Sequence, residues 1–174
     1  MRRSSIQPIT GFFTVAVLGT AAHFIYEWSG DSVWVGAFCA VNESTWEHMK
    51  LLFFPALLFT LLQTVLLRED LMLPAVRAAA VTAGLLLIPT LYYTYSGILG
   101  FRVLWADLAV FYLSDAAIFL LDARLRRRRW LRKPGPQPLG LLWLWALAFL
   151  FVWWTFRPPR IGLFLDPLTG RYGI

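Results

Sequence analysis

The segment 42–48, with the sequence NESTWEH, places two carboxylates, an imidazole and an amide just before a long apolar run. Charged side chains inside the hydrocarbon of a membrane cost roughly 2.5–3.5 kcal/mol each on insertion scales, so they are kept mainly for function. Carboxylate and imidazole groups together can transfer protons or bind a divalent metal such as zinc. This segment is therefore the first candidate for a functional site.

Further polar side chains lie at a similar depth on other apolar segments. A helix rises about 1.5 Å per residue, so His23, His48 and Asp107 each lie roughly 7–8 Å from one end of three different helices. Glu47 and Tyr93 lie slightly nearer to that end. We therefore predict a polar layer near one face of the membrane.

Two histidines and a carboxylate in one layer are an acceptable ligand set for zinc, which at catalytic sites usually has three protein ligands and a water. We expect His23, His48 and Asp107 to be the metal ligands. Glu47 or Glu43 would be the base that takes a proton from metal-bound water. The spacing matches no short metal-binding motif, HExxH included. The prediction depends on depth alone.

Several of these residues also have a purely structural interpretation. Ser44 and Glu47 have the spacing of a capping box that starts a helix. Lys50 lies three residues after Glu47 and can pair with it. Glu27 and Asn42 are further polar side chains that we expect around the site. The structural alternative for Glu27 is a solvated residue at a helix end.

Asp107 and Asp115 are eight residues apart and share one face of a helix. Two aspartates facing lipid would cost roughly 5–7 kcal/mol on the insertion scale, so this face should look into a helix bundle. Arg77, on the preceding apolar segment, can reach Asp115 if its long side chain extends towards it. The structural alternative for both aspartates is a hydrogen bond to a neighbouring helix.

The composition places these groups in a membrane protein. Of the 174 residues, 59% are hydrophobic and 17% aromatic, and the mean hydropathy is +0.62. About 20 apolar residues span a bilayer. We predict an all-α membrane protein with a single domain over 1–174, in which about five transmembrane helices form a bundle. The spans lie near residues 8–28, 44–67, 75–95, 103–122 and 139–156, and a short interfacial helix lies over 33–41.

The net charge of +6 is concentrated in one loop, because seven basic residues lie within 124–133. A basic loop between spans marks the cytoplasmic side and attracts anionic lipid, so this charge does not indicate nucleic acid. We expect a cell-membrane location with the N-terminus in the cytoplasm. The tail over 157–174 would then lie outside, folded over the polar layer as a lid. The first span is alternatively a cleaved signal peptide.

The segments 23–30, 41–50 and 93–100 and the ending 172–174 resemble an uncharacterised family of small multipass membrane proteins, mostly from Gram-positive bacteria. That family is known only as a domain of unknown function. The resemblance implies a bacterial multipass membrane protein and no established activity. It also implies a histidine after the paired prolines, where this chain has Arg160, so a metal site that used that histidine would lack one donor here.

Three functions compete for these residues. The first is a metal-dependent hydrolase or transferase that acts at the outer leaflet. The second is a small proton-coupled carrier that uses the intramembrane carboxylates and, with so few spans, would work as a homo-oligomer. The third is a non-catalytic assembly or binding subunit in which the polar layer is structural.

Overall fold

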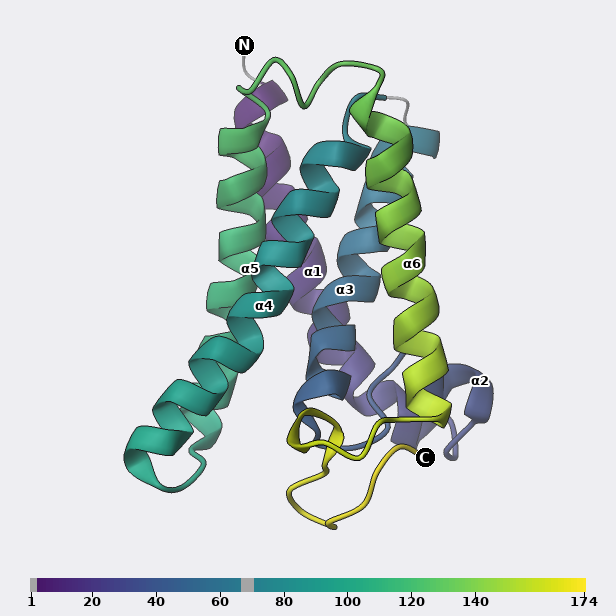
Figure 1. The fold of residues 1–174 in the computed structure, drawn as a ribbon, viewed down its shortest axis with the longest axis vertical. Coiled ribbons are helices and arrows are strands. Elements are labelled where there is room, and N and C mark those ends of the chain that lie inside the picture. Colours follow the sequence, from purple (N-terminus) through teal and green to yellow (C-terminus); the bar gives the residue numbers. More distant parts are fainter. Residues whose placement is uncertain (1–2, 67–70) are drawn as a thin grey trace.

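The computed structural model describes residues 3–66 and 71–174. Within them, five long helices run along the molecule (Figure 1): α1 (Arg3–Trp28), α3 (Thr45–Leu61), α4 (Pro74–Leu99), α5 (Leu104–Leu125) and α6 (Pro136–Phe156). A π-helical segment, Leu62–Leu66, extends α3. The short α2 (Val33–Gly36) and a 3₁₀ turn, Gly162–Phe164, lie in the connecting loop and the tail.

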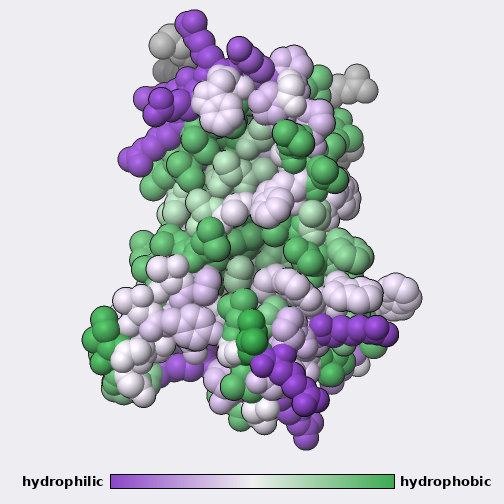
Figure 2. All heavy atoms as spheres, viewed as in Figure 1, coloured by the Kyte–Doolittle hydropathy of each residue, from purple (hydrophilic) through white to green (hydrophobic). Residues whose placement is uncertain are grey.

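The five long helices are each long and apolar enough to cross a membrane. Figure 2 shows apolar residues across the middle of the face in view and strongly hydrophilic residues towards its two ends. These observations confirm the predicted all-α fold class, and the chain is a multipass membrane protein. The helix expected over 33–41 is shorter and covers Val33–Gly36. The Gly36 carbonyl at its end accepts a hydrogen bond from the Lys50 ammonium at 2.7 Å.

Local chemistry explains where the helices around the polar end begin and stop. The Ser44 hydroxyl accepts a hydrogen bond from the Glu47 amide at 3.4 Å, which caps α3 at its first turn. α4 ends at Gly100, whose φ of 76° is the left-handed conformation that glycine adopts without strain. The resulting turn, 100–103, joins α4 to α5 and carries Arg102 to the polar end of the bundle.

α3 is the central helix. In its most apolar stretch of 18 residues 67% are buried, against 22% for α1 and 28% for α6. Small residues let the other helices approach closely, as is usual where helices pack inside a membrane. A Cβ on Gly19 of α1 would lie 2.5 Å from the Leu51 carbonyl of α3, and one on Gly140 of α6 would lie 2.5 Å from the Ala75 backbone of α4.

Replacing Gly140 with alanine is expected to lower the free energy of unfolding by about 1–3 kcal/mol, because the added methyl group meets backbone atoms that cannot rotate away. Gly135→Ala is the matched control. It has no neighbouring atom within 4 Å of its new methyl group and should change stability by less than about 0.5 kcal/mol. Unfolding in detergent measures both variants. Equal stability of the two would contradict the close α4–α6 contact.

The two ends of the molecule carry different elements (Figure 1). The start of α1 and the basic loop before α6 lie at one end. The α1–α3 connection with α2, the turn 100–103 and the C-terminal tail lie at the other end. This second end holds the polar layer that the sequence predicts, and we call it the polar end.

Candidate functional site

Three side chains from separate segments meet at the polar end. His23 of α1 and His48 of α3 both point their Nε2 atoms at Glu43, in the loop before α3. The distances from Nε2 to the carboxylate are 3.5 Å for His23 and 3.6 Å for His48. One donor atom from each residue lies within 4.8 Å of the other two. We call these three residues the histidine cluster.

The protonation of His48 follows from its neighbours. Its Nδ1 lies 3.0 Å from the Ser44 carbonyl, which can only accept, so Nδ1 carries a proton. In neutral His48 the lone pair of Nε2 then faces the Glu43 carboxylate, which is also an acceptor. A cation between them, either a metal ion or a second proton on the imidazole, would make this contact favourable.

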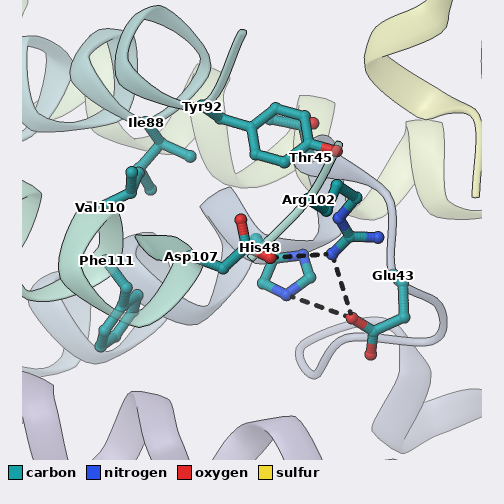
Figure 3. A pocket seen from close by; sticks show the side chains of 9 residues that line it. All are labelled: Glu43, Thr45, His48, Ile88, Tyr92, Arg102, Asp107, Val110 and Phe111. Carbon is teal, nitrogen blue, oxygen red and sulfur yellow. Dashed lines mark hydrogen bonds and ion pairs between the residues drawn. The ribbon is translucent and has the colours of Figure 1, made fainter. Parts of the chain in front are cut away.

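A second group of polar residues lies beside the histidine cluster. Arg102 Nη2 is 3.3 Å from Asp107 Oδ2 and 3.9 Å from Glu43 Oε2. The Tyr95 hydroxyl donates to the other oxygen of Asp107. The guanidinium carbon lies 5.6 Å from the centre of the Tyr92 ring. Figure 3 shows Arg102 between Asp107 and Glu43, with the His48 ring close by.

Arg102 keeps its charge in this setting. Burial acts to lower the pKa of Arg102, but Tyr92, Asp107 and Glu43 together outweigh that effect and raise it above its ordinary value. The guanidinium therefore remains a permanent cation that balances Asp107. Asp107 already accepts hydrogen bonds from Tyr95 and Arg102, whereas the contacts of Glu43 with His23, His48 and Arg102 are 3.5–3.9 Å long. Glu43 is therefore the freer of the two carboxylates to bind a metal.

Two cavities meet at these groups. One lies between α3, α4 and α5 (Figure 3), and the other lies between α1, α3 and α5. Both are lined by Glu43, His48, Arg102 and Asp107, and His23 lines only the second. The polar groups are therefore accessible from two sides of the bundle.

The structure brings together most of the residues expected to form a metal site. His23, His48 and Asp107 line one cavity, as the depth estimate predicts. The third member of the histidine cluster is nevertheless Glu43, which the sequence analysis proposed as a base. Asp107 is held by Arg102 and Tyr95 instead. Helical rise could not place Glu43, because it lies in a loop.

Glu47, the other proposed base, lies in a separate buried network. Its carboxylate is 2.6 Å from the Lys50 ammonium, and the two side chains are 3% and 0% exposed. Lys50 also donates to the Thr155 hydroxyl of α6 at 2.8 Å, and the Val41 amide donates to Glu47 at 3.1 Å. The pairing with Lys50 is the one considered from the sequence. The capping box is only half formed, because the Ser44 amide donates to Asn42 and not to Glu47. Residues 47 and 48 differ by about 100° around the helix, so Glu47 faces away from the cluster.

The remaining polar candidates are apart from the histidine cluster. Asn42 donates to the Gly173 carbonyl at 3.0 Å and accepts from the Ser44 amide at 2.9 Å. The Tyr93 hydroxyl accepts from Thr45 at 3.4 Å. Glu27 is exposed near the end of α1.

The C-terminal tail covers a different part of the polar end from the one expected. Phe164 packs against Trp46 and Trp154, with ring centres 4.8 Å and 5.5 Å away. The tail thereby lies over the ends of α3 and α6, next to the Glu47–Lys50 pair. No tail residue lines either of the two cavities described above. Arg160 is exposed within this tail, so it is not a member of the histidine cluster.

Asp115 does not pair with Arg77, contrary to the pairing considered from the sequence. Arg77 Nε lies 3.4 Å from Asp122 Oδ1, and its Nη2 donates to Gln63 at 3.0 Å. Because α4 and α5 run antiparallel, the start of α4 is level with the end of α5, where Asp122 lies. Asp115 is fully buried, and neither carboxylate oxygen has a hydrogen-bond partner among the described residues.

Arg102 and Tyr95 are the site residues that sequence reasoning missed. No role for Arg102 is predicted from the sequence. Its position five residues before an intramembrane aspartate was the signal available, since a cation in that turn can pair with the carboxylate one helical turn further on. Nothing in the sequence singled out Tyr95 from its neighbouring tyrosine residues.

Comparison with known proteins gives a family and no activity. Searches of the curated proteins and of the solved structures found no match. The model of one family matches residues 5–174, which is nearly the whole chain. This match agrees with the resemblance noted from the sequence. The chain belongs to the Family of unknown function (DUF6512).

Proposed function

We propose that this protein is a metal-dependent hydrolase or transferase that acts at the outer leaflet, with a divalent cation such as zinc bound by His23, Glu43 and His48. Two imidazoles and one glutamate are a donor set that catalytic zinc sites use. Zinc in such a set lowers the pKa of its bound water to about 7 and polarises the bond under attack. Asp107 is the other carboxylate that lines this cavity.

One observation carries this proposal. Nδ1 of His48 is committed to the Ser44 carbonyl, so its Nε2 lone pair faces a carboxylate and the Nε2 of a second histidine approaches the same carboxylate. A metal-binding histidine typically donates its other ring N–H to a carbonyl or carboxylate in this way. The hydrogen bond therefore fixes His48 in the tautomer that a metal requires.

The charges of the cavity also favour a cation. With neutral histidines, Glu43 and Asp107 contribute two negative charges and Arg102 one positive charge, which leaves a net charge of −1. A bound divalent ion changes this to +1. Partial burial in a membrane protein strengthens the attraction, because fewer water molecules screen it.

The orientation that we propose follows from the basic residues. The basic loop over 124–133 lies at the end opposite the histidine cluster (Figure 1). Loops rich in lysine and arginine remain in the cytoplasm, where they also attract anionic lipid. The histidine cluster then faces the outer leaflet of the cell membrane, and the chain ends outside the cell.

Metal analysis of the detergent-purified protein tests the proposal. The wild-type chain, loaded with zinc and freed of excess metal, is expected to retain about one zinc ion, because its three donors form one site. His23→Ala and His48→Ala should each reduce zinc to background. Glu27→Gln is the matched control, because Glu27 lies one turn from His23 and outside the cluster, and it should retain the metal. Wild-type protein with only background metal would reject the proposal and favour the non-catalytic alternative.

A further inference from the structure

Arg102 has hydrogen-bonding capacity that its present partners do not use. A guanidinium has five N–H donors, and only Nη2 of Arg102 contacts the two neighbouring carboxylates. Its Nε has no partner within residues 3–66 and 71–174. The side chain is 28% exposed and lines both cavities beside the histidine cluster. The planar guanidinium of arginine binds anionic groups such as carboxylate and phosphate with paired hydrogen bonds.

The net charge of the metal-loaded cavity favours a ligand with one negative charge. Glu43, Asp107 and Arg102 sum to −1, so a divalent ion gives the occupied cavity a net charge of +1. A monoanionic group would neutralise it. A dianion would leave a negative charge in a partly buried site, and a neutral group would leave a positive one. Both have a desolvation cost.

The second cavity has an apolar side between α1 and α5, where it opens towards the surface of the bundle. Phe24 of α1 and Leu104 and Leu108 of α5 line it and are 44%, 76% and 47% exposed. The wall of the cavity is therefore part of the surface that faces lipid. Figure 1 shows α4 and α5 leaning away from α3 at this end.

The opening between α1 and α5 ends deeper in the membrane. The hydroxyls of Thr20 and Tyr112 are hydrogen-bonded at 3.1 Å and join the two helices. At Gly19 the helices leave no room for a larger side chain, since an added Cβ would lie 2.6 Å from the Phe111 ring. The cavity is thus limited to the outer part of the bundle, near the level of lipid headgroups. The histidine cluster, Arg102 and Asp107 line this cavity within the bundle, and the exposed side chains of Phe24, Leu104 and Leu108 line it towards the lipid.

We propose that the ligand of this cavity is a membrane amphiphile with a single negative charge on its headgroup. Arg102 binds the anionic group beside the metal, and the apolar chain leaves the cavity between α1 and α5, against Leu104 and Leu108. This inference names a substrate class for the proposed metal site and rests on that proposed function. A phosphodiester and a carboxylate share the chemistry that Arg102 recognises.

Ligand titration of the zinc-loaded protein in a neutral maltoside detergent tests this inference. The probes are lysophosphatidylglycerol, a monoacylglycerol with the same acyl chain, and inorganic phosphate. Lysophosphatidylglycerol is expected to bind the wild-type chain at least about tenfold more tightly than the monoacylglycerol, the minimum expected for one charged hydrogen bond. Arg102→Gln should remove this preference.

Two tryptophan variants test the route of the acyl chain. Leu108→Trp fills the opening between α1 and α5 and should weaken lysophosphatidylglycerol binding by about tenfold or more, as expected when a bulky ring displaces a buried chain. Leu113→Trp is the matched control, since Leu113 is an exposed leucine on α5 that lines neither cavity, and it should bind as the wild type does. If inorganic phosphate binds as tightly as the lysolipid and Leu108→Trp does not weaken lysolipid binding, the cavity is a site for free anions and the inference is overturned.

The zinc content of each preparation separates this inference from the proposed function. Bound zinc without any preference for the anionic lysolipid overturns the ligand assignment and leaves the metal site standing. Background zinc together with an Arg102-dependent preference rejects the metal-dependent activity and shows that Arg102 recognises the anionic headgroup without the metal. A zinc-loaded Arg102→Gln variant that still prefers the anionic lysolipid overturns the role of Arg102.

Discussion

Lys50→Met is expected to lower the free energy of unfolding by about 3–5 kcal/mol, the loss found when one partner of a buried ion pair is removed. The Lys50 and Glu47 side chains are almost completely buried, and their charged atoms are 2.6 Å apart. Without the ammonium, the buried charge of Glu47 retains the Val41 amide and the Thr155 hydroxyl as its partners among the described residues. The Gly36 carbonyl also loses its hydrogen bond from Lys50. Unfolding of the purified protein in detergent measures the loss.

The double variant Glu47→Leu/Lys50→Met is the control for this interpretation. Replacing both partners of a buried pair by apolar residues is often neutral, so the double variant should be clearly more stable than Lys50→Met alone. Glu27→Gln, an exposed change, should alter stability by less than about 0.5 kcal/mol. A Lys50→Met protein as stable as the wild type would contradict the buried pair.

The Glu47–Lys50 pair also helps to position the histidine cluster, because it contacts the backbone of the segment that carries Glu43. It joins α3 to the Gly36 and Val41 backbone on one side and to Thr155 of α6 on the other. These contacts hold both ends of the loop that carries Glu43. We therefore regard the pair as a structural support for the cluster.

Zinc is expected to stabilise the wild-type protein by about 4 kcal/mol when free zinc is a thousand times its dissociation constant. The cluster joins α1, the loop before α3 and α3 itself, and these donors separate when the chain unfolds. A ligand that binds only the folded chain must raise its stability. The midpoint of thermal unfolding should therefore rise with added zinc and fall again with a chelator.

Variants of the cluster identify where zinc acts. Glu43→Gln and His23→Ala should lose most of the zinc-dependent shift, whereas Glu27→Gln should keep it. Magnesium is the ion control, because it prefers oxygen ligands in octahedral geometry and should have little effect on a site with two imidazoles. An unchanged zinc shift in His23→Ala would mean that zinc binds elsewhere.

The segment 42–48 serves two sites because successive residues point in different directions. Glu43 and His48 face the cavities beside Arg102. Asn42 and Glu47 face the tail and α6, where they bind Gly173 and the network of Lys50 and Thr155. A helix turns by about 100° per residue, so neighbours such as positions 47 and 48 cannot share a face. The density of polar residues in this short segment reflects both a structural support and a candidate site.

Several features of this protein follow from the sequence alone. The length of the apolar runs determines the five spans, because a bilayer needs about 20 apolar residues per helix. The constant rise of a helix sets depth, so His23, His48 and Asp107 were expected to lie at one level, and they line one cavity. Ser44 marks the start of α3 because its hydroxyl satisfies a free backbone amide.

The tertiary structure decided which groups at the same depth become partners. Depth does not specify how far a helix is rotated about its axis, and rotation depends on packing at contacts such as Gly19 against α3. Loop residues have no helical rise to count, so Glu43 and Arg102 could not be placed in advance. Glu43 therefore joined the histidines while Arg102 and Tyr95 held Asp107, because these pairings depend on distances across helices that are set only when the bundle packs.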